Sequence, residues 1–360
     1  WLGLMAFADF FPILCMGPVA GAYADRLERL RAIRLYVFLS GILSAIIAGL
    51  TIGDVIDRYS LLLLVFLNGT VLAFNYPFRL AIINELVQRD ALTSAISINS
   101  IGFNLARIVG PALAGVLIAN VGVGPAVIFT VFADIVFIIA LYQVHLLGGD
   151  VRPEGKSIRD VPGEIIEGFR YVVQNTGFAP LLLVLLLITI FGRPLNELQA
   201  GFSDTVFGMG ADGVAWLFSA FGAGAAVGCV ELACYNGIKG LTNKMITNVC
   251  LLAVGVLGFV ATDIFWFALL SIAVMGYAYA VLGIAELALL QAAVADDMRG
   301  RMMSFYSMIS RGCPGFGALL MGYLATFAGL RIPIGAGAII CLAVWLWIRT
   351  RRDVMIEKLE

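Results

Sequence analysis

Long runs of apolar residues, separated by short polar turns, constrain this chain more than any other feature. A helix needs about 20 consecutive, largely apolar residues to cross the hydrocarbon core of a bilayer, where lipid offers the backbone no hydrogen-bond partner. The chain contains eleven such runs and therefore predicts an all-α membrane protein. The predicted spans are 2–23, 33–52, 60–83, 92–118, 125–146, 177–199, 213–236, 244–262, 264–292, 302–328 and 332–349.

Composition agrees with this prediction and argues against several classes of function. Of the 360 residues, 61% are hydrophobic and 13% are charged, whereas a soluble domain is about half apolar and a quarter charged. The net charge of −1 provides no basic field for nucleic acid. The six cysteines form no Cys-x-x-Cys pair and His145 is the single histidine, so we expect no metal or cofactor. Because we find no paired nucleophile and base, we do not expect an enzyme.

The distribution of Arg and Lys among the turns predicts the orientation of the spans. Cytoplasmic turns collect these residues, and here they follow the odd-numbered spans, whereas the alternate turns carry only Arg58 and Arg331. Odd spans are therefore expected to exit to the cytoplasm, which places Trp1 on the outer side. Five spans precede the longest loop and six follow it, so we expect a twelve-helix protein whose first helix is absent from this chain.

The longest loop divides the chain into two expected helix bundles. The expected parts are an amino-terminal bundle at 1–146, a cytoplasmic linker at 147–176, a carboxy-terminal bundle at 177–349 and a cytoplasmic tail at 350–360. The later part of the linker has apolar residues along one side, and it is either an amphipathic surface helix or a partly ordered connection. A weak internal repeat, which aligns Ser97 with Ser304, suggests two related halves.

A basic turn between the first two predicted spans carries a motif. Gly21 is followed after three residues by Asp25 and Arg26, and then by Arg29. This arrangement resembles the cytoplasmic signature of the major facilitator superfamily of transporters, although Glu28 stands where that superfamily usually has Gly. The resemblance implies two six-helix bundles that rock around a site at the membrane midplane. Arg31 matches the signature as well. The resemblance also implies a gating role for Gly21, Asp25, Arg26 and Arg29, through contacts that exist in one conformation only; simple topogenic charge is the alternative.

Two further segments resemble one branch of the superfamily, which contains enterobactin exporters and macrolide-efflux proteins. The first runs over 76–118 and includes Arg79, and the second starts at Asp297 and includes Arg299 and Arg301. We add these three arginines to the expected gating residues. The branch resemblance implies export but identifies no substrate.

A third motif lies inside the first of these segments. Gly110-Pro111, followed by Gly115, resembles the fifth-helix motif of superfamily exporters. Gly and Pro there permit a bend and close contact between helices, which suits a helix that alternates between two packings. Ordinary helix packing is the alternative explanation.

Ionisable residues inside predicted spans are candidate sites, because a charge in the membrane is costly unless it faces the protein interior. Asn104 and Arg107 are three residues apart, so they share a helical face near mid-membrane, and Asp134 lies in the following span. These residues either line a central cavity or include a structural Arg107–Asp134 pair. Asp9 is a lone carboxylate in the first span.

The second half contains another set of such residues. Arg193 and Glu197 are four residues apart near the outer end of their span, where they form either an outer gate or a local ion pair. Glu286 and Arg311 lie toward the inner ends of adjacent helices, where they can form an inner-gate pair, and Glu286 can carry a proton. Glu231 is close to the cytoplasmic boundary, so we expect it to be solvated.

The resemblance and the intramembrane charges together predict a secondary active transporter. We expect a proton-coupled exporter of amphipathic small molecules, such as a siderophore or a lipophilic drug, that works as a monomer in the bacterial inner membrane by alternating access. The 24 Phe and 11 Met residues suit adaptable apolar recognition, although most of them are expected to face lipid or the core. Uptake or lipid handling by the same fold, or a non-transporting scaffold or sensor, are the alternatives.

Overall fold

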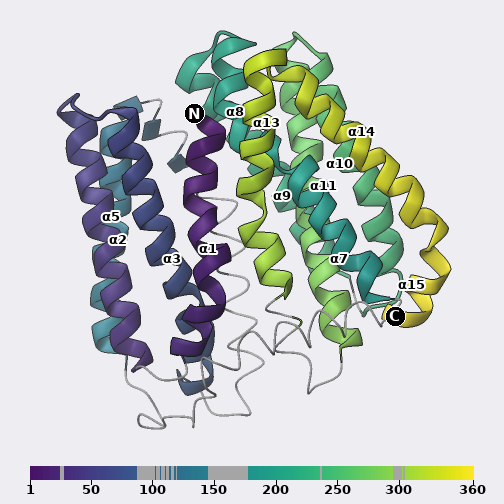
Figure 1. The fold of residues 1–360 in the computed structure, drawn as a ribbon, viewed down its shortest axis with the longest axis horizontal. Coiled ribbons are helices and arrows are strands. Elements are labelled where there is room, and N and C mark those ends of the chain that lie inside the picture. Colours follow the sequence, from purple (N-terminus) through teal and green to yellow (C-terminus); the bar gives the residue numbers. More distant parts are fainter. Residues whose placement is uncertain are drawn as a thin grey trace. The chain divides into compact units, whose positions relative to one another are not determined.

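The computed structural model is helical throughout the regular elements that it describes (Figure 1). It describes residues 1–24, 28–86, 102, 106, 110, 113–114, 117–118, 120–144, 177–235, 237–294, 302 and 305–360. Helices satisfy their backbone N–H and C=O groups within the segment, which is the condition that lipid imposes on a spanning structure. The predicted all-α fold class is confirmed.

The helices fall into two groups along the chain. The first group consists of α1 (Leu2–Ala24), α2 (Arg29–Ile52), α3 (Arg58–Leu86) and α5 (Val123–Gln143). The second consists of α7 (Phe178–Leu187), η3 (Ile188–Gly192), α8 (Pro194–Thr205), α9 (Gly210–Ala233), α10 (Leu241–Ala261), α11 (Phe265–Ala293), η4 (Met308–Gly312), α13 (Pro314–Ala328), α14 (Arg331–Thr350) and α15 (Arg352–Leu359). Among the described residues, eight helical segments are long and apolar enough to cross a membrane.

The predicted spans and the observed helices agree to within four residues wherever both are described, except that α8 continues to Thr205, six residues past the predicted end of its span. Helix α2 begins at Arg29 rather than at residue 33, because backbone hydrogen bonding continues past the apolar run into the basic turn. Most of the predicted span 92–118 and all of the linker 147–176, with its possible amphipathic helix, lie outside the described residues.

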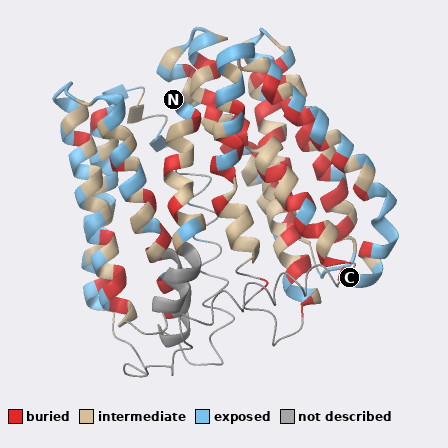
Figure 2. Ribbon diagram, in the orientation of Figure 1, coloured by how far each residue is buried: buried red, intermediate tan, exposed pale blue. Residues whose placement is uncertain are grey.

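Helix α2 has one side exposed and the other side buried. Leu35, Phe38 and Ile42 are exposed on one side, whereas Ile33 and Val37 are almost completely buried on the other (Figure 2). A continuous exposed apolar stripe of this kind is unfavourable in water. It is the expected surface of a helix that faces lipid, so the exposure pattern supports a membrane-spanning protein.

The described chain forms two compact units, and the first contains α2, α3 and α5. Ile33, Phe78 and Leu141 belong to its apolar core. The Arg34 guanidinium donates through Nη2 to the carbonyl of Leu141 at 2.7 Å and lies 4.4 Å from the centroid of the Tyr142 ring. This basic residue therefore ties the start of α2 to the end of α5.

The second unit contains the helices from α7 to α15 and has a large apolar core. Helices α9 and α11 approach each other closely where glycines replace larger residues. A Cβ atom added to Gly224 would lie 1.8 Å from the carbonyl oxygen of Ala273, and one added to Gly276 would lie 2.1 Å from that of Phe221. Small residues at such crossings let the backbones of membrane helices pack together.

The terminal helix α15 packs against the start of α10 and the end of α11. Met355 and Leu359 are buried there. The Glu360 carboxylate accepts hydrogen bonds from the backbone N–H groups of Gly240 and Thr242, at 2.6 and 2.7 Å. Burial raises the pKa of this carboxyl, but the two N–H donors lower it by more, so the net shift is downward. Helix α15 is thus docked against this unit, with the Glu360 carboxylate at the start of α10.

Candidate functional site

The first helical segment of the second unit bends in its middle. Helix α7 continues into the π-helical turn η3, and α8 resumes with Pro194 in its first turn. A π turn departs from the regular hydrogen-bond pattern, and Pro has no N–H to donate, so the bend re-aims the side chains around it. Arg193 lies at this bend, between η3 and α8.

Arg193 contacts two other helical segments of the same unit. Its Nη1 atom donates to the backbone carbonyl of Ser310 in η4 at 2.8 Å. Its Cζ atom lies 4.4 Å from the centroid of the Tyr279 ring on α11, a cation–π contact. Its charge also acts on Glu197, four residues further along the same segment, as the helical spacing predicts. The Arg193 guanidinium at this bend therefore interacts with residues of α8, α11 and η4.

Glu286 of α11 is the most deeply buried acidic residue in the described part of the chain, with 2% of its surface exposed. Its Oε1 atom has no hydrogen-bond partner among the described protein residues. Arg193 is close enough to this carboxyl, and to that of Glu197, for its positive charge to act on both. Arg311 lies in η4, and its predicted pair with Glu286 stays a prediction.

Further polar groups line the same bent helix. Thr189 and Gln199 are completely buried, and neither the Thr189 Oγ1 nor the Gln199 Oε1 atom has a hydrogen-bond partner in the described structure. Gln199 donates to Asn196 at 3.2 Å. Buried polar groups are usually satisfied, so each group without a partner is a place where a bound molecule or water can supply the missing hydrogen bond.

The chemistry available at this cluster is binding rather than bond breaking. It offers carboxyl groups that can take up a proton or face a cation, one guanidinium, and neutral donors and acceptors from Thr, Asn and Gln. The described residues contain no group of three or more His, Cys, Asp or Glu that could hold a metal ion. The arrangement suits recognition of a polar group inside an apolar bundle.

Three predicted residues lie in the first unit. Asp134 of α5 is half-buried, its Oδ2 atom has no hydrogen-bond partner in the described part, and its Cβ would be 3.5 Å from a Cβ on Gly41. Arg79 is exposed, and its Cζ atom lies 5.3 Å from the centroid of the Phe137 ring. Asp9 of α1 is partly buried. The structure does not assign a role to any of these three.

The remaining predicted residues lie partly inside and partly outside the described part of the chain. Gly21 lies in α1, Arg29 begins α2, and Gly110 has a helical backbone. The remaining gating, pathway and motif residues fall outside the described part of the chain: Asp25, Arg26, Asn104, Arg107, Pro111, Gly115, Arg299 and Arg301. Their roles stay predictions.

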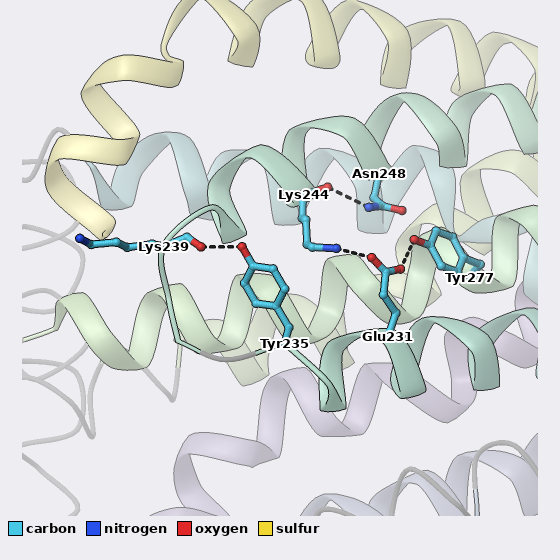
Figure 3. A network of polar contacts seen from close by, with 6 residues as sticks. All are labelled: Glu231, Tyr235, Lys239, Lys244, Asn248 and Tyr277. Carbon is cyan, nitrogen blue, oxygen red and sulfur yellow. Dashed lines mark hydrogen bonds and ion pairs between the residues drawn. The ribbon is translucent and has the colours of Figure 1, made fainter.

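A second polar network joins the end of α9, the start of α10 and the middle of α11, and it was not among the predicted sites. Figure 3 shows Lys244 and Tyr277 pointing at the Glu231 carboxylate, and both donate to it. Asn248 donates to the carbonyl of Lys244 at 2.8 Å, and the Lys244 ammonium lies 4.9 Å from the centroid of the Tyr235 ring. Glu231 keeps about a third of its side chain exposed, as its place near the end of the span predicts, but it also pairs with Lys244 across the short α9–α10 turn, which was not expected.

This network predicts a measurable contribution to stability. Replacing Lys244 by Met leaves the Glu231 carboxylate without its cation. The Lys244 and Glu231 side chains are 27% and 36% exposed, so solvent screens the pair, and we expect a loss on the order of 1 kcal/mol in the free energy of unfolding. Thermal unfolding of the detergent-solubilised protein measures it. The matched control is Lys239→Met, because Lys239 joins the network only through its backbone carbonyl. Equal stability of the two variants would contradict the prediction.

The apolar helices define a multi-pass membrane protein, and its fold is that of major facilitator transporters. The structure of a POT family transporter in complex with 5-aminolevulinic acid matches with a TM-score of 0.73 over 98% of this chain and 88% of that one, at 11% identity. The human organic anion transporter MFSD10 matches with a TM-score of 0.68 over 96% and 82%, at 16% identity. At these identities the likeness concerns the fold alone.

The family follows from the sequence. The profile of the transmembrane secretion effector family matches residues 2–358, so the chain belongs to that family of the major facilitator superfamily. The predicted superfamily and its exporter branch are therefore confirmed.

Three curated bacterial proteins are similar to this chain in sequence. The multidrug efflux pump Tap of Mycolicibacterium fortuitum is 25% identical over 91% of this chain and 81% of its own length. The enterobactin exporter EntS of Escherichia coli is 24% identical over 85% and 72%. The staphyloferrin A transporter of Staphylococcus aureus is 33% identical, but that match spans 33% of this chain and 30% of the relative.

Proposed function

We propose that the protein is a secondary active exporter of amphipathic small molecules in the bacterial inner membrane, driven by inward movement of protons. The observation that carries the proposal is the Glu286 carboxyl, which is buried inside a spanning bundle and whose Oε1 atom has no hydrogen-bond partner among the described residues. The efflux and export named for two bacterial relatives support outward transport.

Glu286 supplies the proton site in this proposal. An ionised carboxylate inside a span is costly without a full counter-charge, and a proton or a bound cation removes that cost. Because Oε1 has no partner among the described residues, a proton or a polar group of the cargo can bind there without displacing an existing hydrogen bond. Proton and cargo then compete for one carboxyl, which couples two opposite fluxes.

The surroundings of this carboxyl suit an amphipathic cargo. The Tyr279 ring lies against the Arg193 guanidinium on one side and packs edge-to-face with Phe221 at a centroid distance of 5.6 Å. Aromatic faces of this kind bind flat apolar groups, and a few placed polar groups orient them. Thr189 and Gln199 provide such polar groups on the bent helix.

Alternating access between two six-helix bundles completes the proposed cycle. Asp25 and its neighbours would hold one conformation through contacts that break in the other. The proposed gating residues are Gly21, Asp25, Arg26, Arg29, Arg79, Arg299 and Arg301, and the proposed pathway residues of the first half are Asp9, Asn104, Arg107 and Asp134. We further propose that the monomer is the functional unit.

Flux measurements in sealed membrane vesicles test the proposal. Everted vesicles from a host without its own efflux pumps would receive a catecholate siderophore, a hydroxycarboxylate siderophore or a fluorescent lipophilic cation, with and without an imposed proton gradient. We expect accumulation of at least one compound that depends on the gradient and disappears with a protonophore. Accumulation only in right-side-out vesicles would favour uptake, and no flux in either orientation would favour a scaffold or sensor.

A further inference from the structure

Two bent helical segments of the carboxy-terminal unit share one local design. In each, a π turn of five residues is followed by a single residue and then by Pro. The first turn, η3, is followed by Arg193-Pro194, and the second, η4, by Cys313-Pro314. Pro and π turns are the recognised causes of sharp helix bends, and π turns are frequent at functional positions.

Pro314 removes a backbone hydrogen-bond donor from the second bend. In a regular α-helix the N–H of residue 314 would donate to the carbonyl of Ser310, and Pro has no N–H. The donor found at that carbonyl comes from another helix, since the Nη1 atom of Arg193 lies 2.8 Å from the Ser310 oxygen. The guanidinium of the first bend thus replaces the hydrogen bond that the second bend lacks.

The first bend has a matching contact in the opposite direction. Pro194 removes the regular donor for the carbonyl of Ile190, and this oxygen lies against α13, where a Cβ added to Gly317 would come within 2.4 Å of it. A Cβ added to Gly337 of α14 would likewise lie 2.6 Å from the next carbonyl oxygen, that of Phe191. Glycine permits such close approach of another backbone. The Ile190 carbonyl of the first bend therefore faces α13, which directly follows the second bend. The Ser310 carbonyl of the second bend faces Arg193 of the first.

These contacts make the geometry of one bend depend on that of the other. A carbonyl without a donor is costly in an apolar bundle, so straightening or rotating η4 is opposed while Arg193 holds Ser310. We propose that Arg193 is a positioning residue that couples the two bends, so that they flex as one unit. The consequence for transport rests on the proposed function, whereas the coupling itself is a property of the folded protein.

Hydrogen exchange of backbone amides, followed by mass spectrometry on the solubilised full chain, tests the coupling without any transport assay. In Arg193→Gln we expect exchange in peptides covering 308–318 to rise roughly tenfold, because a hydrogen bond from a charged donor is lost at a distant carbonyl. Arg193→Lys, which retains a charged donor, should show a smaller rise.

Pro314→Ala provides the reciprocal test. The alanine N–H can donate to Ser310 and release Arg193, so exchange should rise in peptides covering 188–196, where nothing has been changed. In the double variant, Arg193→Gln should add little further exchange at 308–318, because Ser310 has regained its own donor. If Arg193→Gln does not fold, Pro314→Ala alone still decides the question.

The control is Arg331→Gln. Arg331, the first residue of α14, also donates to a backbone carbonyl far away in the chain, that of Thr262 in the turn between α10 and α11, at 3.0 Å. Its effect should stay local to that turn. The proposal is overturned if Arg193→Gln changes exchange only next to residue 193, or if Pro314→Ala leaves 188–196 unchanged. If the exchange changes appear as expected but the native protein shows no gradient-driven vesicle flux, only the proposed function is contradicted.

Discussion

Glu286→Gln is expected to leave the protein folded and to abolish most of its gradient-driven transport. The amide has nearly the shape of the carboxyl group but can neither release nor bind a proton at neutral pH. Coupling free energies between two ligands are typically about 1–3 kcal/mol, which corresponds to 5–150-fold, so we expect at least a roughly tenfold lower flux in the presence of a proton gradient. Vesicle flux at matched protein amounts measures this difference.

Stability separates this coupling role from a structural one. The Glu286 carboxyl is buried, and its Oε1 atom has no hydrogen-bond partner in the described structure, so removing its charge should leave the free energy of unfolding unchanged or raise it. Glu357→Gln is the matched control, because Glu357 is exposed on α15 and should alter neither quantity. Transport by Glu286→Gln with unaltered dependence on the gradient would remove Glu286 from the proposed proton path.

Gly224→Ala and Gly276→Ala should destabilise the carboxy-terminal unit strongly. Each added methyl group would lie about 2 Å from a backbone carbonyl of the facing helix, at 1.8 Å from Ala273 and 2.1 Å from Phe221. Backbone cannot move aside as a flexible side chain can, so α9 and α11 must separate. Overpacking typically costs about 1–3 kcal/mol, and we expect the upper part of that range for each variant. Thermal unfolding in detergent measures the effect.

Gly283→Ala supplies the comparison on the same helix. No heavy atom lies within 4 Å of a Cβ built at Gly283, and Ala is the better helix former in water by about 1 kcal/mol, so this change should be neutral or stabilising. The two destabilised variants should also show faster amide exchange along α9 and α11. Similar unfolding temperatures for Gly224→Ala and Gly283→Ala would show that the close crossing is not required for stability.

The helices themselves could be predicted because each one depends on its own residues. A run of about 20 apolar residues is sufficient to favour a spanning helix, and the observed bounds of α9, α10 and α11 follow the predicted runs closely. The candidate charges could be found by the same local argument, since Glu286 and Arg193 are ionisable residues inside apolar runs. The superfamily resemblance added the topology that local rules do not supply.

The partners of those charges could not be predicted. Arg193 was expected to pair with Glu197, its neighbour on the helix, but its guanidinium also reaches Ser310, which is 117 positions away in the chain. The Gly-x-Pro sequence at each bend is a signal for a broken helix, whereas each of these two spans was predicted as one continuous helix. Glu231 was expected in solvent, whereas Lys244 and Tyr277 both donate to it.

The sequence alone thus determined which segments are membrane helices, which superfamily they resemble and which residues are too polar for their surroundings, because hydrophobic length and the cost of burying charge are local quantities. Only the tertiary structure decided which of these residues meet. The site at Glu286 depends on where the bend at η3 aims Arg193 and on how α11 and η4 pack beside it. Those positions come from contacts between segments far apart in the chain, which no local rule encodes.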